Sequence, residues 1–127
     1  MWLVTGDLLK HIREQLSISF DQAMNYTSQI LSGTVYLHYG LDHPIIHGDL
    51  KCENIMVNCV RSNCPDTQID YVLKVGDLDS SVRLKDTMTQ ATDWEKSIVY
   101  GTVSHMAPEV ILHKKGEVKE WGRSMDY

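Results

Sequence analysis

The sequence has 127 residues, so one domain at most is expected, and its 43% hydrophobic content suits a packed core rather than a disordered chain. A formal net charge of −5 argues against binding to nucleic acid or to anionic membranes, because both need clustered positive charge. No apolar run reaches the roughly 20 residues that span a bilayer, and the N-terminus lacks a secretory signal, so an intracellular, cytoplasmic protein without a membrane span is expected.

The first predicted elements are helices. In residues 5–16 apolar side chains recur at helical spacing, and Asp7 lies near the start, where a carboxylate favours exposed backbone amides. A longer amphipathic helix is predicted for about residues 20–38. Ser19 and Gln22 form a capping-box pattern before it. Its predicted face consists of Phe20, Ala23, Met24, Thr27, Ile30, Leu31, Val35 and Leu37.

Short apolar segments farther along the chain predict buried strands, at residues 43–46, 54–57 and 71–75. The polar, turn-rich residues between the last two fit a hairpin with a long loop. From about residue 80 to 104 the chain has no clear period. A loop of that length in a compact domain usually has a functional reason. No internal repeat or linker indicates a second domain.

The segment HGDLKCEN, residues 47–54, concentrates polar side chains between two predicted strands. Asp49 can accept a proton from a substrate hydroxyl. Lys51 points the same way in an extended segment, and its charge can hold a transferring phosphoryl group. Asn54 and Asp77, each beside an apolar strand, offer oxygen ligands for Mg²⁺. Each residue alone could be an ordinary turn or surface residue, but together they meet the requirements of phosphoryl transfer.

Three segments, in the right order, resemble those of protein kinases. HGDLKCENIMV resembles the catalytic loop H-R-D-L-x-x-x-N, KVGDLDSS resembles the D-F-G turn with its strand, and GTVSHMAPEVI resembles the segment ending in A-P-E. The resemblance implies one partial kinase domain over residues 1–127, from the hinge to the start of the central large-lobe helix. The implied fold is mainly α with short β-hairpins, a partial C-terminal lobe of the kinase-like α+β fold.

The resemblance also implies a role for each matching residue. Asp49 would be the catalytic base and Lys51 would contact the γ-phosphate of ATP. Asn54 and Asp77 would bind Mg²⁺. Thr102 would position the substrate by bonding to the base and the lysine. The other cofactor contacts would come from Asp7 at the ribose, Glu53 in the catalytic loop and Met56 at the adenine.

Lys51 and Thr102 point to serine/threonine specificity, since tyrosine kinases usually place another residue at the lysine position. The resemblance thus implies ATP and Mg²⁺ as cofactors and a protein as substrate. HGDLK and MAPEVI together suggest the tyrosine-kinase-like or MAP-kinase-kinase-kinase-like groups.

Some positions depart from the family pattern. Gly48 replaces an arginine that pairs with loop phosphate in many kinases, so activity is not expected to depend strongly on loop phosphorylation. Asp79 replaces the glycine of D-F-G and adds a negative charge, which either weakens nucleotide binding or supplies a third metal-facing carboxylate. Neither a glycine-rich phosphate loop nor the V-A-I-K type lysine occurs in the 127 residues. The chain alone is therefore expected to be inactive, with apolar surface exposed on the helix at 20–38.

Two main hypotheses follow. In the first, the complete domain transfers phosphoryl groups to protein Ser/Thr hydroxyls. In the second, the chain is a pseudokinase-like or truncated binding module that acts through a protein partner covering its exposed large-lobe surface. A metal hydrolase built on His38, His43 and His47 is a third hypothesis, disfavoured because their spacing matches no helix-borne ligand motif. The three cysteines form no CxxC pair, so neither a disulfide framework nor a zinc site is indicated.

Overall fold

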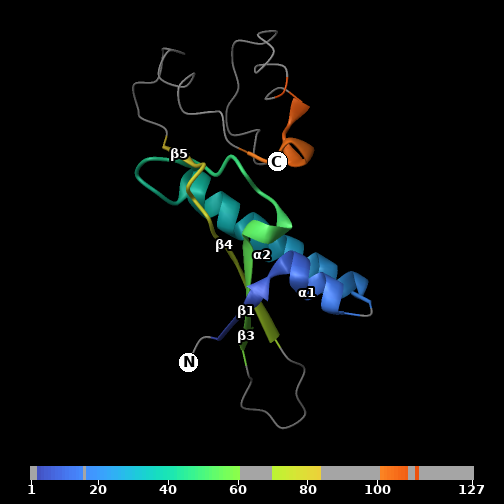
Figure 1. Ribbon diagram of the computed structural model, residues 1–127. Coiled ribbons are helices and arrows are strands. Elements are labelled where there is room, and N and C mark those ends of the chain that lie inside the picture. Colours follow the sequence, from blue (N-terminus) through green and yellow to red (C-terminus); the bar gives the residue numbers. More distant parts are fainter. Residues whose placement is uncertain (1–2, 16, 61–69, 84–100, 109–110, 112–127) are drawn as a thin grey trace. The chain divides into compact units, whose positions relative to one another are not determined.

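The computed structural model describes residues 3–15, 17–60, 70–83, 101–108 and 111, coloured by position in Figure 1. The chain divides into two compact units. The first consists of Met1–Gly33 and Cys52–Gly76, and the second of Thr34–Lys51 and Asp77–Tyr127. Most of the two predicted long loops lies outside the described residues.

The first unit contains a three-stranded antiparallel sheet in the order β1-β3-β4. Its strands are β1 (Leu3–Asp7), β3 (Ile55–Val60) and β4 (Asp70–Val75). Strands β3 and β4 pair in register from Ile55 opposite Val75 to Val60 opposite Asp70. The predicted strands at 54–57 and 71–75 are therefore confirmed. The core of this unit contains Leu8, Tyr26, Ile55, Val57 and Leu73.

The helices begin where the sequence predicts. Helix α1 (Leu8–Glu14) is capped by Asp7, whose carboxylate accepts a hydrogen bond of 2.8 Å from the backbone N–H of Lys10. Helix α2 (Phe20–Tyr39) follows the predicted capping box. The Ser19 N–H donates to the Gln22 side chain at 3.0 Å, and the Gln22 N–H donates to the Ser19 hydroxyl at 3.2 Å.

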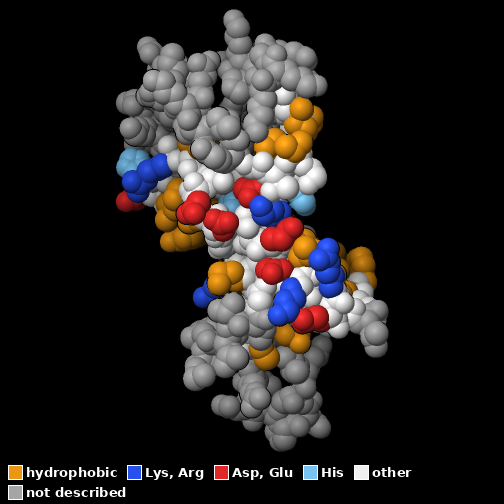
Figure 2. Space-filling view, in the orientation of Figure 1, with side chains coloured by type: hydrophobic (Ala, Val, Ile, Leu, Met, Phe, Trp, Pro, Cys, Tyr) orange, Lys and Arg blue, Asp and Glu red, His pale blue; other side chains and the backbone are white. Residues whose placement is uncertain are grey.

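The apolar face predicted for α2 is largely exposed. Phe20, Met24, Leu31 and Val35 have 49 to 77% of their surface exposed. The buried positions of the helix are instead Tyr26, Thr34 and His38, which are eight and four residues apart, and all three carry a polar group. The predicted exposure of apolar surface on this helix is therefore confirmed. Apolar side chains that reach the surface are orange in Figure 2.

Gln29 fastens α2 to β4 within the first unit. Its side-chain amide donates to the carbonyl oxygen of Tyr71 at 3.1 Å, and its carbonyl oxygen accepts from the N–H of Leu73 at 2.7 Å. Gln29 thus provides hydrogen-bond partners for two backbone groups on the outer edge of β4. A polar side chain can therefore lie where the helix contacts the sheet.

Replacing Gln29 by alanine is expected to destabilise the protein by about 2 kcal/mol, because two part-buried backbone groups of β4 lose their partner. Urea unfolding of the protein and the variant measures the change. The exposed Ser32 of the same helix provides the control, and Ser32→Ala should change stability by less than about 0.5 kcal/mol. Equal effects of the two substitutions would contradict the bridging role of Gln29.

A histidine of α1 lies against two tyrosines in the first unit. The rings of His11 and Tyr71 have centroids 4.3 Å apart, and the Tyr26 hydroxyl lies 2.9 Å from His11 Nε2. The Gln15 amide nitrogen donates to the same nitrogen at 2.8 Å. Burial lowers the pKa of His11 from its ordinary value of 6.5, and the Glu14 carboxylate opposes this only in part.

Stability is therefore expected to fall as the pH drops below about 6.5, because the unfolded chain then binds a proton that the folded His11 resists. The loss is complete below the lowered pKa of the folded state. Thermal unfolding between pH 8 and pH 5 tests this against His11→Gln, which cannot be protonated and should show a flatter profile. Identical profiles for the two proteins would refute the assignment.

The second unit begins within α2 and contains β2 (Ile45–Ile46), β5 (Val82–Arg83) and the 3-10 turn η3 (Val103–His105). Strands β2 and β5 are antiparallel, with Ile46 opposite Val82. Ile46 is fully buried, so the chain enters the polar segment at 47 from a fixed point. The predicted strand at 43–46 is confirmed in its second half.

The described residues thus contain two helices and two small antiparallel sheets, an α+β arrangement, in which β3 and β4 pair as predicted from the sequence. No helix in this described part is long and apolar enough to cross a membrane.

Candidate active site

The segment after β2 sets the direction of Asp49. His47 is fully buried, and its Nδ1 accepts a hydrogen bond of 3.3 Å from the backbone N–H of Asp49. Between them Gly48 has a φ of 77°, in the left-handed region that glycine adopts without strain. The chain therefore turns sharply at Gly48, directly before the carboxylate predicted to be the base.

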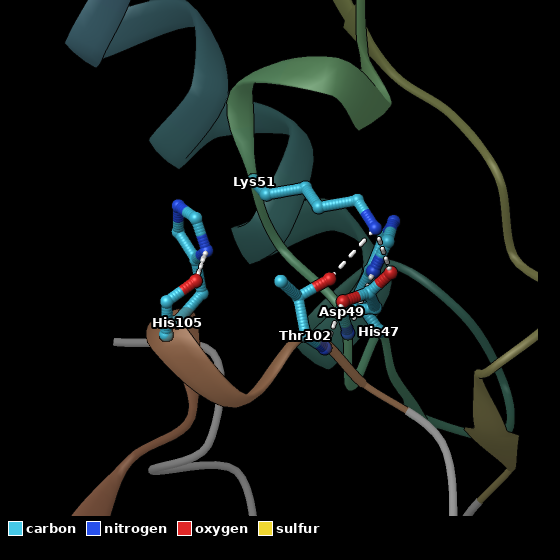
Figure 3. A network of polar contacts seen from close by, with 6 residues as sticks. His47, Asp49, Lys51, Thr102 and His105 are labelled. Carbon is cyan, nitrogen blue, oxygen red and sulfur yellow. Dashed lines mark hydrogen bonds and ion pairs between the residues drawn. The ribbon is translucent and has the colours of Figure 1, made fainter.

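Asp49, Lys51 and Thr102 form one hydrogen-bonded group in the second unit (Figure 3). The Lys51 ammonium donates to Asp49 Oδ2 at 2.7 Å and to the Thr102 hydroxyl at 2.8 Å. The backbone N–H of Thr102 donates to Asp49 Oδ1 at 2.7 Å. Three residues that the sequence predicted for one site are thus brought together, although Thr102 lies 51 positions after the lysine.

The surroundings of Asp49 keep its carboxylate ionised. Burial by itself would raise the pKa of this group, but hydrogen bonds from Lys51 and from Thr102 outweigh burial and lower the pKa to about 2. The side chains of Lys51 and Asp49 are only 20% and 10% exposed, so solvent screens the pair incompletely. At neutral pH the site therefore holds a carboxylate and an ammonium in fixed positions.

This arrangement can orient a hydroxyl and balance charge. A carboxylate has about four acceptor positions, so one held by Lys51 and Thr102 can also accept from a substrate hydroxyl. A group of such low pKa is a weak base, which suits proton uptake late in a reaction. The positive charge of the ammonium can stabilise an anionic group that approaches the hydroxyl.

The candidate Mg²⁺ ligands lie in different units. Asn54 is 7% exposed in the turn η1 (Cys52–Asn54) of the first unit, and its backbone carbonyl accepts from the N–H of Gly76 at 2.9 Å. Asp77 is exposed and belongs to the second unit. An amide oxygen and a carboxylate are suitable donors for Mg²⁺, so both residues fit this ion chemically. The described residues contain no group of three or more His, Cys, Asp or Glu side chains that could hold a metal.

The substitution at position 79 leaves the local turn in place. The Ser81 N–H donates to the Leu78 carbonyl at 2.9 Å, and Asp79 is exposed within this turn. Asp77 has a φ of 57° and is the one non-glycine residue with positive φ in the described part of the chain. Asp79 therefore does not need the freedom of glycine for the turn to form.

The remaining predicted cofactor residues lie in the first unit. Asp7 is the cap of α1, Glu53 is exposed in η1, and Met56 in β3 is 42% exposed. Burial, followed by the negative charges of Glu53 and Asp7, raises the pKa of the Cys52 thiol. Asp7 and Glu53 thus both lie near enough to Cys52 for their charges to act on its thiol.

The sequence did not reveal every contact of this site. The bond from the Thr102 N–H to Asp49 and the burial of His47 were both missed, because neither leaves a pattern in neighbouring residues. Gly101 directly precedes Thr102 and has a φ of 136°. A glycine at such a place in the sequence can indicate a backbone conformation that other residues avoid. Some residues discussed from the sequence lie outside the described residues. These are Glu109 of A-P-E and the loop residues Thr87, Thr89, Thr92 and Ser97.

Known proteins resemble almost the whole chain. The protein kinase domain family matches residues 2–127. Mitogen-activated protein kinase kinase kinase 1 of Homo sapiens is 28% identical over 125 residues, which cover 98% of this chain and 7% of that protein. Probable serine/threonine-protein kinase WNK4 of Arabidopsis thaliana is 34% identical over 114 residues, 90% of this chain and 17% of that protein. Mitogen-activated protein kinase kinase kinase zak-1 of Caenorhabditis elegans is 36% identical over 98 residues, 77% of this chain and 11% of that protein. The chain thus spans a small part of the length of these relatives.

Proposed function

Because the chain belongs to the protein kinase family, we propose that it supplies the catalytic loop for ATP-dependent phosphoryl transfer to Ser/Thr hydroxyls of a protein substrate. In this proposal residues 1–127 form part of the large lobe of the kinase fold. The observation that carries it is the bonded group of Asp49, Lys51 and Thr102. An ionised carboxylate paired with a cation supplies the base and the positive charge that this chemistry uses at the acceptor hydroxyl.

Each residue of the group has a proposed task. Asp49 accepts a hydrogen bond from the substrate hydroxyl and so directs the oxygen of that hydroxyl toward the γ-phosphorus of ATP. It takes up the hydroxyl proton as the bond between this oxygen and the phosphorus forms. Lys51 balances the negative charge that moves on the phosphoryl group. Thr102 holds both residues in position. Bound Mg²⁺, with Asn54 and Asp77 as its proposed ligands, would neutralise the phosphates of ATP.

Phosphoryl transfer from ATP to peptides tests the proposal. The whole protein that contains this sequence is incubated with Mg-ATP and with matched peptides. The peptides differ only in carrying a Ser, Thr or Tyr acceptor. Phosphate is expected on the Ser and Thr peptides, and EDTA should abolish the reaction because Mg²⁺ is removed. Exclusive labelling of the Tyr peptide, or transfer that persists in EDTA, would contradict the proposal.

A binding module is the second candidate, favoured by the exposed apolar residues of α2. These include Phe20, Met24, Leu31, Val35, Tyr36 and Tyr39. A thermal-shift experiment with Mg-ATP separates the candidates, because a ligand stabilises only a folded site that binds it, by about 2.7 kcal/mol at 100 times Kd. For residues 1–127 alone we expect no shift. A clear shift is expected for the complete reading frame if it is an enzyme, and its absence there would favour the binding module.

Loop phosphorylation is expected to have little influence on activity. Gly48 cannot pair with a phosphate as arginine does in many kinases. Alanine at all the loop hydroxyl positions, Thr87, Thr89, Thr92 and Ser97, should therefore leave most of the phosphotransferase activity of the complete protein. A steady-state peptide assay measures this, and complete loss of activity would overturn the prediction.

A further inference from the structure

Strand β4 is an edge strand of the three-stranded sheet in the described part of the chain. Successive residues of an antiparallel strand alternate between bonding to the paired strand and pointing their backbone groups away from it. The carbonyl oxygen of Tyr71 and the N–H of Leu73 bond to the side chain of Gln29, at 3.1 and 2.7 Å, so both groups point away from β3. A strand edge that carries such groups can pair with another strand.

The side-chain amide of Gln29 takes the place of a neighbouring strand at this edge. It supplies one donor and one acceptor, which are the groups that a paired strand would supply there. The exposed Asn25, one helical turn earlier, accepts from the same amide nitrogen at 2.6 Å and so helps to orient the amide. Gln29 and β4 belong to the same compact unit. The edge between residues 71 and 73 is therefore closed by a side chain and not by a strand.

This edge is complementary to a second copy of itself. When two β4 strands pair antiparallel about Val72, Tyr71 of each copy stands opposite Leu73 of the other, and the outward N–H and C=O groups of both residues find partners. The same register places Asp70 opposite Lys74, so that opposite charges pair across the two strands. Backbone bonding and charge thus favour the same register.

We propose that Gln29 holds closed a strand-pairing edge of β4, and that this edge pairs with the β4 edge of a second copy of the chain when the amide is withdrawn. The two states compete. Gln29 offers its bonds within one molecule, whereas a second copy pairs more of the outward groups but requires two molecules to associate. The closed state is therefore favoured at low protein concentration. This association does not depend on phosphoryl transfer.

Sedimentation equilibrium of the whole protein that contains this sequence tests the association. Gln29→Ala is expected to dimerise with an association constant at least about ten-fold above that of the parent protein, because the intramolecular bonds no longer compete. Tyr26→Phe is the matched control, since it removes a hydroxyl that lies 2.9 Å from His11 Nε2 in the same unit and leaves the edge of β4 unchanged. Its association constant should equal that of the parent protein. If Gln29→Ala does not fold, Gln29→Met replaces it, because methionine has similar helix propensity and no amide.

Hydrogen exchange at the Leu73 amide identifies the surface that pairs. In the parent protein this amide should exchange slowly at every concentration, because Gln29 accepts its hydrogen bond. In Gln29→Ala it should exchange rapidly in dilute solution and slowly in concentrated solution, where the second copy replaces the side chain. Equal association constants for Gln29→Ala and the parent protein would overturn the inference. So would dimerisation of Tyr26→Phe to the same extent, or a Gln29→Ala dimer in which the Leu73 amide still exchanges rapidly.

Discussion

Replacing Asp49 by asparagine is expected to lower kcat for peptide phosphorylation by about 10³-fold, within the usual range for loss of a general base. Asparagine has nearly the same shape, and its oxygen can still accept from the Thr102 N–H. It cannot take up a proton, and it removes the negative charge that holds Lys51 at 2.7 Å. The effect should therefore appear in kcat and leave KM for ATP nearly unchanged.

The exposed Asp42 of the second unit provides a matched control. Asp42→Asn makes the same chemical change away from the bonded group and should leave kcat within about two-fold, as surface substitutions usually do. Steady-state assays on both variants, with melting temperatures measured alongside, distinguish catalysis from stability. Equal kcat values for Asp49→Asn and Asp42→Asn would contradict a catalytic role for Asp49.

Replacing Lys51 by methionine is the second large expected effect, with kcat falling by about 10²- to 10³-fold, as on removal of a preorganised electrostatic contact. Methionine keeps most of the aliphatic chain of lysine but removes the ammonium that donates to both Asp49 and Thr102. The substitution also removes an interaction that lowers the pKa of Asp49 to about 2. The pKa should therefore rise, and the acid limb of the pH–rate profile should move to higher pH.

Thr102→Val and Thr102→Ser refine this result. Valine removes the hydroxyl that accepts from Lys51 but keeps the backbone N–H that donates to Asp49. Its loss of kcat should thus be smaller than that of Lys51→Met, and serine should retain most of the activity. If Lys51→Met shifts neither kcat nor the acid limb, the ammonium does not act on Asp49 during catalysis.

Local patterns in the sequence predicted the features that depend on neighbouring residues. The capping pair Ser19 and Gln22 predicted the start of α2, and Asp7 caps α1 as its position indicated. The apolar runs predicted β3 and β4. The order of HGDLKCEN, KVGDLDSS and GTVSHMAPE predicted the protein kinase family, which the match over residues 2–127 confirms.

Contacts between distant segments were beyond local patterns. Strands β1 and β5 were not predicted, because their few residues become strands only by pairing with β3 and β2. The side of α2 that contacts β4 was missed for a related reason. Half-buried Gln29 bonds there to backbone groups more than 40 residues later, and apolar periodicity does not register such polar contacts.

The candidate site shows the same division. The resemblance placed Asp49, Lys51 and Thr102 in one site, and the structure brings them together, while their catalytic roles stay predictions. The contact of Gly101 with Gly48 depends on the path of the backbone between residues 48 and 101. No spacing in the sequence specifies such an approach, although two glycines beside predicted site residues are a useful signal.

The most direct test of the proposed function is transfer of labelled γ-phosphate from Mg-ATP to a serine peptide by the complete reading frame, with the Asp49→Asn variant assayed in parallel. We expect transfer by the parent protein and a loss of about 10³-fold in the variant. Absence of transfer by the folded parent protein, or equal rates for the parent and the variant, would contradict a phosphotransferase site built on Asp49.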